Sequence, residues 1–310
     1  MRVGASAALS HPGRKRRHNE DSYVIEPPLF VIADGMGGAK AGEVASGLAV
    51  SAVEAEQGDG ASGEQRVTAL IEEANRRVYS RATEDRDVHG MGTTMTVALV
   101  EDNAVAFGHV GDSRAYLIRD GQLDQLTDDH SLVAELVRGG KLTPEEAESH
   151  PQRSVITRAL GTEPDIDVDT FSVQPEPGDV FMLCSDGLTT MVDDQTILDA
   201  VEQHRSDLRQ AAKALVNAAN RGGGEDNITV IFFEVDTGAE EPSEETEETV
   251  AAPVLPDDEE TMDESHAVPP VAVAESQVEP RRRGRFLPIL AALAILLIIA
   301  AALLWLLDNL

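Results

Sequence analysis

LFVIADGMGG, residues 29–38, joins an apolar run to an aspartate and three glycines. An apolar run of this length, bounded by turn residues, predicts a buried strand. The glycines do not have the G-x-G-x-x-G spacing, and no Gly-Lys-Ser/Thr ending follows them, so the pattern of a nucleotide-binding loop is not met. We therefore expect a core strand that ends at Asp34 and carries its carboxylate to the edge of a sheet.

Other strand-like runs meet aspartates in the same way. VFMLCSDG ends with Asp186, VAFGHVGDS leads to Asp112, and Asp226 stands directly before NITVIFFEV. A single Asp-Gly pair is most often a plain turn, but four aspartates at strand ends are a stronger signal. Oxygen ligands without histidine or cysteine favour Mg²⁺ or Mn²⁺ over zinc. If these ends converge, the sequence predicts an all-oxygen metal site.

The remaining patterns predict strands interleaved with helices, without regular β-α-β alternation. The spacing of apolar residues predicts helices over 42–56, 64–82, 194–204 and 206–220 and strands over 93–102, 103–110, 114–126, 180–186 and 227–235. Asp120-Gly121 divides the third of these strand stretches into a hairpin, so residues 93–126 are expected to form an antiparallel meander. The predicted class is α+β, an α-β-β-α sandwich of two antiparallel sheets flanked by helices.

Composition excludes several classes of protein. The chain has 310 residues, of which 42% are apolar, so a sizeable core can form. Lys and Arg total 25 against 56 Asp and Glu, a net charge of -31, which repels nucleic acid. The acidity has a plainer reading as salt adaptation or a solubility device. Cys184 is the only cysteine, which rules out an intrachain disulfide and a multi-cysteine zinc site.

The C-terminal region predicts a membrane anchor. Residues 286–307 carry no charge over 22 positions, which spans about 33 Å as a helix and crosses a bilayer. The alternative, a buried core helix, lacks a following domain to cover it. Arginines at 281–283 and 285 precede the span, and only residues 308–310 follow it. The positive-inside rule then places the upstream part in the cytoplasm, as a single-pass protein of the cell membrane.

Between body and anchor lies an acidic segment. Residues 238–280 hold 14 acidic residues and no Lys or Arg, a composition typical of a disordered, self-repelling tether. A docking strip for a kinase or another partner is the second reading. The predicted organisation is a catalytic domain over 1–237, a linker over 238–285 that ends in the basic run, the transmembrane helix over 286–307 and a short extracytoplasmic tail over 308–310.

Five short motifs, in this order, resemble those of the metal-dependent protein serine/threonine phosphatases, the PPM or type 2C family. They are RRHNEDS (16–22), ADGMGG (33–38), VGDSR (110–114), SDGL (185–188) and EDNIT (225–229). HPQRSVITRALG, residues 150–161, is similar to the bacterial branch of that family. The resemblance covers residues 1–237.

The resemblance implies two core Mn²⁺ or Mg²⁺ ions and a weaker third one. The core ligands that it implies are Asp34 as the bridge, Gly35 through its carbonyl, Asp186 and Asp226 on one ion, and Glu20 and Asp21 on the other, partly through water. Asp112, with Asp186 and Ser154, is implied to bind the third ion near a mobile flap. Two ions together stabilise both sides of an in-line displacement by a metal-activated water.

The substrate phosphate and the leaving group involve two further positions. Arg16 matches the arginine that binds the phosphate, and it lies within the basic run RKRR, residues 14–17, where a solvated basic patch is the plainer reading. Met36 stands where eukaryotic members carry a histidine that protonates the leaving group. Methionine donates no proton, so a metal-bound water is the first candidate. Five histidines are expected to be structural or exposed rather than catalytic: His11, His18, His109, His130 and His150.

The resemblance implies a phosphatase that hydrolyses phosphoserine and phosphothreonine in proteins. Its partners would be phosphoproteins, Ser/Thr protein kinases and the substrates of those kinases, with the membrane tether holding enzyme and kinase in one plane. Three alternatives remain open from the sequence. They are an anchored adaptor of weak or no activity, a hydrolase of small phosphate esters, and a regulatory phosphatase that acts on an anti-sigma-factor antagonist.

Overall fold

The apolar run of residues 29–38 forms strand β3 (Leu29–Met36) in the computed structural model. The structure describes residues 2–37, 41–54, 61–101 and 103–236, all within one compact unit. The predicted linker over 238–285, the predicted transmembrane helix over 286–307 and the tail beyond it lie outside the described residues. Among the helices that are described, none is both long and apolar enough to cross a membrane.

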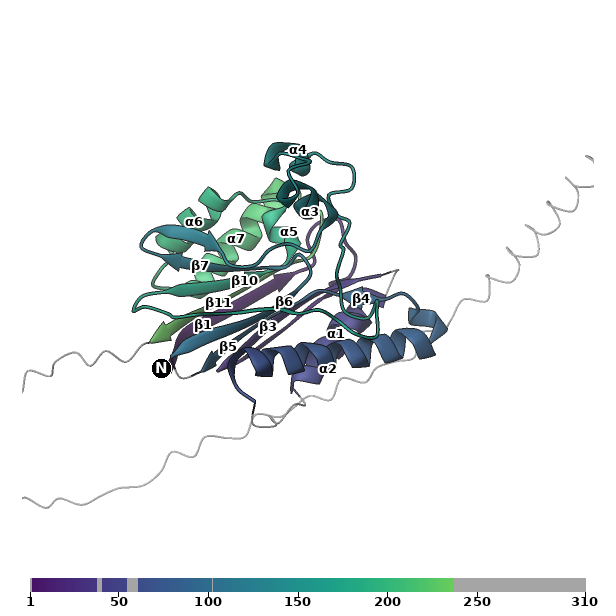
Figure 1. Ribbon diagram of the computed structural model, residues 1–310. Coiled ribbons are helices and arrows are strands. Elements are labelled where there is room, and N and C mark those ends of the chain that lie inside the picture. Colours follow the sequence, from purple (N-terminus) through teal and green to yellow (C-terminus); the bar gives the residue numbers. More distant parts are fainter. Residues whose placement is uncertain (1, 38–40, 55–60, 102, 237–310) are drawn as a thin grey trace, which may run out of the picture. The chain divides into compact units, whose positions relative to one another are not determined.

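Two antiparallel sheets face each other, as Figure 1 shows. The first sheet has the order β1-β11-β10-β7-β8, and the second has the order β2-β3-β5-β6-β9, with the short strand β4 paired to β3. Their bounds are β1 (Arg2–His11), β2 (Asp21–Glu26), β4 (Gly92–Thr93), β5 (Met95–Glu101), β6 (Ala104–Val110), β7 (Arg114–Arg119), β8 (Gln122–Gln125), β9 (Asp169–Val173), β10 (Val180–Cys184) and β11 (Ile228–Asp236).

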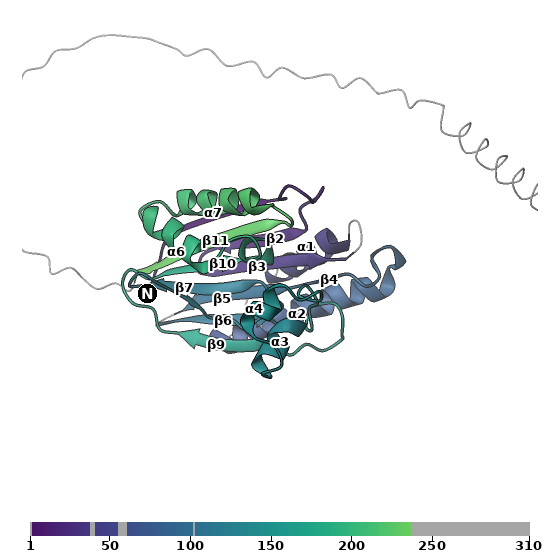
Figure 2. The ribbon, with the colours of Figure 1, turned by 90° about the horizontal axis from the view of Figure 1, so that it is seen from above.

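Helices cover the outer face of each sheet. The two helices that pack on the second sheet are α1 (Ala41–Glu54) and α2 (Gly63–Glu84). The first sheet is covered by α5 (Asp186–Thr189), α6 (Asp194–Gln203) and α7 (Leu208–Gly222), which Figure 2 shows from above. The remaining helical segments are the 3-10 turn Arg86–Val88, α3 (Leu132–Arg138) and α4 (Pro144–Glu148). The predicted α-β-β-α sandwich is confirmed.

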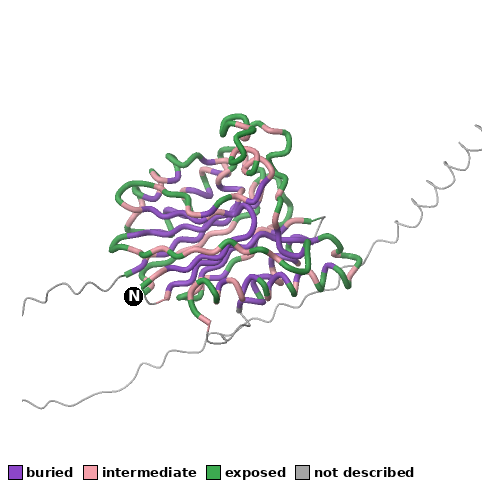
Figure 3. The backbone as a smooth tube through the Cα atoms, in the orientation of Figure 1, coloured by how far each residue is buried: buried purple, intermediate pink, exposed green. Residues whose placement is uncertain are grey.

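The core lies between the sheets and beneath both helical layers, where Figure 3 shows buried backbone along the central strands. Aromatic rings join the two sheets. Phe30 of β3 stacks on Phe233 of β11, with 4.1 Å between ring centroids, and the ring centroid of Phe107 of β6 lies 5.9 Å from that of Phe181 of β10. Alternate residues of these strands thus fill the space between the sheets, and the others face the helices.

The predicted meander over residues 93–126 is wrong in one respect. β5 and β6 pair in the second sheet, whereas β7 and β8 pair in the first. The chain changes sheets between β6 and β7 at Gly111, which has a φ of 119°, where a side chain is rarely tolerated. The predicted Asp120-Gly121 hairpin is present, with positive φ at both residues, as a type I′ turn requires.

Candidate metal centre

Asp34 and Asp21 start the site. Asp34 lies near the end of β3, and Asp21, the first residue of β2, is its direct register partner. Two threonines just before β5 fix the backbone of Asp34. Thr94 Oγ1 accepts from the Asp34 amide at 3.0 Å, and the Thr94 amide donates to the Asp34 carbonyl at 2.9 Å. Thr93 Oγ1 also donates to that carbonyl at 2.8 Å. The bridging carboxylate implied by the sequence is thus held on rigid strands.

Asp186 and Asp226 come from the opposite sheet. Asp186 follows β10 and is the first residue of α5, and Asp226 stands two residues before β11, the strand that neighbours β10. Ser185 and Thr229 tie these two strand ends together, because the Ser185 amide donates to the Thr229 carbonyl at 3.1 Å and Ser185 Oγ accepts from the Thr229 amide at 3.0 Å. The two faces of the sandwich therefore contribute carboxylates to the same end.

These carboxylates act on one another electrostatically. Burial, and then the charges of Asp21 and Asp186, raise the pKa of Asp34 well above its usual value. Burial, and then the neighbouring Asp226, raises the pKa of Asp186 to about 6. Burial also raises the pKa of Asp21 to about 7, against hydrogen bonds that lower it. Several buried carboxylates lie close together here, and a bound cation would neutralise their negative charge.

Asp21 shows how the site is built. Its Oδ2 accepts from Ser185 Oγ at 2.9 Å and from Thr229 Oγ1 at 2.6 Å. Its Oδ1 is buried and has no hydrogen-bond partner among the described residues. A buried carboxylate oxygen without a donor is costly unless something else binds it. Asp21 therefore presents one oxygen that fits a cation.

Glu20 and Gly35 meet at the N-terminus of α1. The Glu20 carbonyl accepts from the Gly35 amide at 3.1 Å and from Ser46 Oγ at 2.6 Å. A Cβ at Gly35 would lie 2.1 Å from the Gly42 carbonyl oxygen, and a Cβ at Gly42 would lie 2.7 Å from Glu20 Oε2. Only glycine permits this approach, which brings the Glu20 carboxylate and the β3 backbone together.

Arg16 lies beside this group. Its Nη2 donates to Asp226 Oδ2 at 2.7 Å, and its side chain is half exposed. Arg14, two residues earlier, instead donates from Nη1 to the Asn220 carbonyl at 3.3 Å. The structure thus places Arg16 against Asp226, an implied metal ligand. The exposed part of the Arg16 side chain can be reached by a phosphate from solution.

Asp112 and Ser154 differ in their positions. Asp112 is buried between β6 and β7, and burial, and then the charge of Asp186, raises its pKa to about 8. Ser154 lies in an exposed turn and forms no hydrogen bond with the described residues. The structure therefore brings Asp112 within electrostatic reach of Asp186 and gives no contact that links Ser154 to either residue.

The donor set fits hard divalent cations, because it consists of carboxylate and carbonyl oxygens. In the described part of the chain, no three His, Cys, Asp or Glu side chains already form a close metal cage. Asp226 is turned to Arg16, and one oxygen of Asp21 is taken by two hydroxyls. The group therefore has the chemistry of a metal centre, with Asp226 engaged elsewhere.

Met36 makes an apolar contact and has no acidic proton to donate. Its side chain lies against β4, because a Cβ at Gly92 would stand 2.8 Å from Met36 Cε. Sequence reasoning marked this position as a missing proton donor, and the structure shows an apolar contact there.

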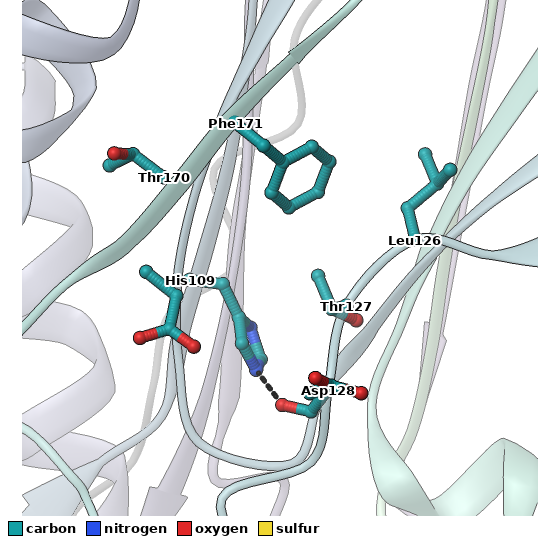
Figure 4. A pocket seen from close by; sticks show the side chains of 7 residues that line it. His109, Leu126, Thr127, Asp128, Thr170 and Phe171 are labelled. Carbon is teal, nitrogen blue, oxygen red and sulfur yellow. Dashed lines mark hydrogen bonds between the residues drawn. The ribbon is translucent and has the colours of Figure 1, made fainter.

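A pocket of about 390 Å³, which Figure 4 shows from close by, has none of the six implied core ligands in its lining. Its lining includes His109, Asp128 and Phe171. His109 donates from Nε2 to the Asp128 carbonyl at 3.2 Å, and its ring lies 4.8 Å from that of His130. His130 Nδ1 in turn accepts from the Gly111 amide at 3.0 Å. Both histidines are buried and hydrogen-bonded, in line with their expected structural role.

Sequence reasoning missed the hydrogen-bonding partners of the site. Asn227, within the quoted motif EDNIT, accepts from the Glu20 amide at 2.8 Å, and Thr94 holds the Asp34 backbone. The sequence gave one indication of Asn227, because this residue directly follows Asp226, an implied metal ligand. The partners across the fold, however, lie far away in the chain.

Comparisons with known proteins agree with this geometry. Residues 15–222 match the Protein phosphatase 2C family. The chain is 42% identical over 233 residues to the serine/threonine phosphatase stp of Listeria welshimeri, covering 72% of this chain and 92% of that protein. It is also 42% identical over 231 residues to the serine/threonine protein phosphatase PstP of Mycobacterium tuberculosis, covering 74% of this chain and 44% of that longer protein.

A solved structure shows the same fold. The catalytic domain of the serine/threonine protein phosphatase PstP, in complex with two manganese ions, superposes with a TM-score of 0.67 at 38% identity, covering 76% of this chain and 99% of that one. The resemblance drawn from the five motifs is confirmed. The chain belongs to the protein phosphatase 2C family and is a bacterial-type serine/threonine protein phosphatase.

Proposed function

We propose that this phosphatase binds its metal ions through the carboxylates at the shared end of the two sheets. The observation that carries the proposal is the register pairing of Asp21 with Asp34, together with Asp21 Oδ1, which is buried and has no donor among the described residues. Asp34 would bridge two ions, with the Gly35 carbonyl beside it. Asp186 and Asp226 would complete one ion, and Glu20 with Asp21 the other.

Mn²⁺ or Mg²⁺ at these residues would neutralise phosphate charge and lower the pKa of the attacking water. The PstP catalytic domain holds two manganese ions, which supports two core ions here. Asp112, grouped with Asp186, supports a weaker third ion. Ser154 stays a prediction as the remaining ligand of that ion, beside Asp112 and Asp186.

Arg16 would bind and orient the substrate phosphate. A guanidinium forms paired hydrogen bonds with phosphate oxygens, which a lysine cannot reproduce. Its pairing with Asp226 places it at the edge of the carboxylate group, and its exposure leaves donors free for a phosphoserine or phosphothreonine side chain. Water is our first candidate for the donor of the leaving-group proton, because Met36 cannot donate one and His109 and His130 are buried and hydrogen-bonded.

The test is phosphate release from a phosphothreonine peptide. Wild type is expected to need Mn²⁺ or Mg²⁺, to stop in EDTA and to recover when metal is restored. Asp34→Ala should release no phosphate, whether or not Mn²⁺ or Mg²⁺ is added. Asp124→Ala, an exposed aspartate on β8, is the matched control and should behave as wild type. Full turnover by Asp34→Ala would overturn the assignment of the metal centre.

Three alternatives have their own outcomes. An adaptor without turnover would bind phosphopeptide and Mn²⁺ but release no phosphate under any metal condition. A hydrolase of small esters would act faster on an aryl phosphate than on phosphoproteins from a kinase of the same host. A regulatory phosphatase for an anti-sigma-factor antagonist would prefer that one phosphoprotein in the same comparison.

We further propose that residues 286–307 anchor the enzyme in the cell membrane and that it opposes Ser/Thr kinases there. The uncharged stretch and the preceding arginines support a single span with the catalytic domain in the cytoplasm. Deleting residues 286–310 should move the protein from the membrane fraction to the soluble fraction and leave kcat on a peptide unchanged. Membrane association that survives the deletion would overturn the anchor.

A further inference from the structure

The side chain of Asn227 joins both ends of the loop between β1 and β2. Nδ2 donates to the carbonyl oxygens of Pro12 at 3.1 Å and His18 at 3.0 Å, and Oδ1 accepts from the Glu20 amide at 2.8 Å. Asn227 is 3% exposed, so these bonds form away from water. Both hydrogens of the Asn227 side-chain amide, and one lone pair of its oxygen, are therefore bonded to this loop.

The loop is also fastened by the segment before Asn227. The Gly224 carbonyl accepts from the amides of Arg14 at 2.8 Å and Lys15 at 3.1 Å. Gly13 has a φ of 74°, and a Cβ there would lie 2.1 Å from the Asp226 carbonyl oxygen, so the loop presses directly on the chain that carries Asp226. The turn of the loop thus sits on residues 224–227.

Arg16 depends on this backbone for its position. It lies between the anchored residues Lys15 and His18, and its side chain is half exposed with its described hydrogen bond to Asp226. Little packing holds such a side chain in place, so the path of the loop sets where the guanidinium can reach. Asn227 and Asp226 are neighbours in the chain, so one dipeptide fixes the loop and supplies a carboxylate to the centre.

We propose that Asn227 is a positioning residue for substrate phosphate, which it serves by holding the loop that carries Arg16 over Asp226. The proposal rests on the proposed role of Arg16 as the phosphate-binding residue. Asn227 itself touches neither the substrate nor the reacting atoms.

Asn75 provides a matched control. It lies on α2, is 1% exposed and makes the same set of bonds, from Nδ2 to the carbonyls of Glu163 and Pro164 at 3.1 Å each, and to Oδ1 from the Gly161 amide at 2.8 Å. Replacing either asparagine by serine removes an equivalent buried network without adding charge. A general loss of stability should therefore be similar in Asn75→Ser and Asn227→Ser.

The experiment compares these two variants with wild type in saturating Mn²⁺. Asn227→Ser is expected to raise the KM for a phosphothreonine peptide and the Ki of inorganic phosphate by about tenfold, as loss of two or three hydrogen bonds permits, with kcat changed by less than about threefold. Asn75→Ser should leave both constants near wild type. Equal constants in the two variants would overturn the proposal.

Two measurements separate positioning from a merely structural role. Hydrogen exchange without added metal should quicken at the amides of residues 14–20 in Asn227→Ser and stay unchanged there in Asn75→Ser. In an Arg16→Ala background, Asn227→Ser should raise KM by less than about twofold, because the interaction that it supports is already gone. Independent, multiplicative effects of the two substitutions would overturn the proposal.

A second variant covers failure to fold. Asn227→Ala removes the three hydrogen bonds to Pro12, His18 and Glu20 and adds neither charge nor a new polar group. It should show the same rise in the Ki of phosphate. If wild type releases no phosphate from peptides, the proposed function fails, and exchange at residues 14–20 still decides whether Asn227 holds the loop.

Discussion

Asp21 and Asp34 lie directly opposite each other on the neighbouring strands β2 and β3. Like charges in that register destabilise a sheet, and burial adds to the cost. The raised pKa of both carboxyls is the sign of that cost. The lower stability that this pair causes is expected if both carboxylates bind metal as proposed, because functional sites are often kept at a cost in stability.

Divalent cations are therefore expected to stabilise the fold. A ligand at 100 times its Kd adds about 2.7 kcal/mol, so Mn²⁺ should raise the melting temperature by several degrees over EDTA. Asp34→Asn should melt higher than wild type in EDTA, because it removes a repelling charge, and should lose most of the shift with Mn²⁺. Differential scanning calorimetry measures both. A wild-type melting temperature that is the same in Mn²⁺ and in EDTA would contradict the proposed metal site.

The strands that the sequence predicted well are the buried ones. β3, β10 and β11 are apolar on both faces, and such runs stand out from their surroundings. β1 and β9 were missed because they are edge strands, half exposed and rich in small or polar residues. Edge strands owe their pairing to a neighbour from elsewhere in the chain, which no local pattern records.

The site divides in the same way. The aspartates were visible because each stands where an apolar strand ends, next to glycine. The hold of Asn227 on the loop was not visible, since it joins residues such as Glu20 that lie 207 positions away. The contact of Met36 with Gly92 could not be predicted from the sequence either, because it depends on the pairing of β3 with β4.

Gly187 is expected to be intolerant of any side chain. A Cβ there would lie 1.9 Å from the Asn227 carbonyl oxygen, so Gly187→Ala must push α5 away from the start of β11. We expect a loss of about 1–3 kcal/mol or more in the free energy of unfolding, together with weaker Mn²⁺ binding. Urea unfolding and metal titration give the two values.

Gly47→Ala is the control for that substitution. Gly47 lies in the middle of α1 with no atom within 4 Å of a Cβ, so alanine should stabilise by about 0.5–1 kcal/mol. Similar losses in both variants would show that the contact between Gly187 and Asn227 does not decide the outcome.

Arg119 and Asp179 form an ion pair at the far end of the first sheet. Arg119 donates from Nε to Asp179 Oδ1 at 2.8 Å, and Asp179 is 1% exposed. Arg119→Ala would leave the buried Asp179 carboxylate without a cation, with the Glu176 amide as its remaining donor at 2.7 Å, and is expected to cost up to about 3 kcal/mol. Activity at low temperature should persist, because the length of β10 separates Asp179 from Asp186.

The exposed pair of Arg76 and Glu73 on α2 is the comparison. Arg76→Ala should cost no more than about 1 kcal/mol, as surface pairs do. Chemical denaturation of both variants measures the contrast. Equal costs would mean that burial of Asp179 does not set the strength of its pair.

His109 predicts how stability responds to acid. Burial, and then the nearby His130, lowers the pKa of His109 to about 4, against the opposing charges of Asp129 and Asp169. The Asp128 carbonyl can only accept, so Nε2 of His109 carries the proton and Nδ1 accepts from Thr96 Oγ1 at 2.9 Å. The neutral ring is thus the form that the fold selects.

The sign of the effect follows from the two states. The unfolded chain takes up a proton at His109 near pH 6.5, and the folded chain does so only near pH 4, so His109 stabilises the fold above pH 6.5 and loses that contribution as pH falls. Between pH 7 and pH 5 the loss is on the order of 2 kcal/mol. His109→Gln cannot titrate, so the gap in unfolding free energy between wild type and His109→Gln should narrow by that amount. Urea titrations of both proteins in saturating Mn²⁺, which suppresses titration of the aspartates, measure the gap, and a gap that stays constant from pH 7 to pH 5 would show that His109 is not held neutral.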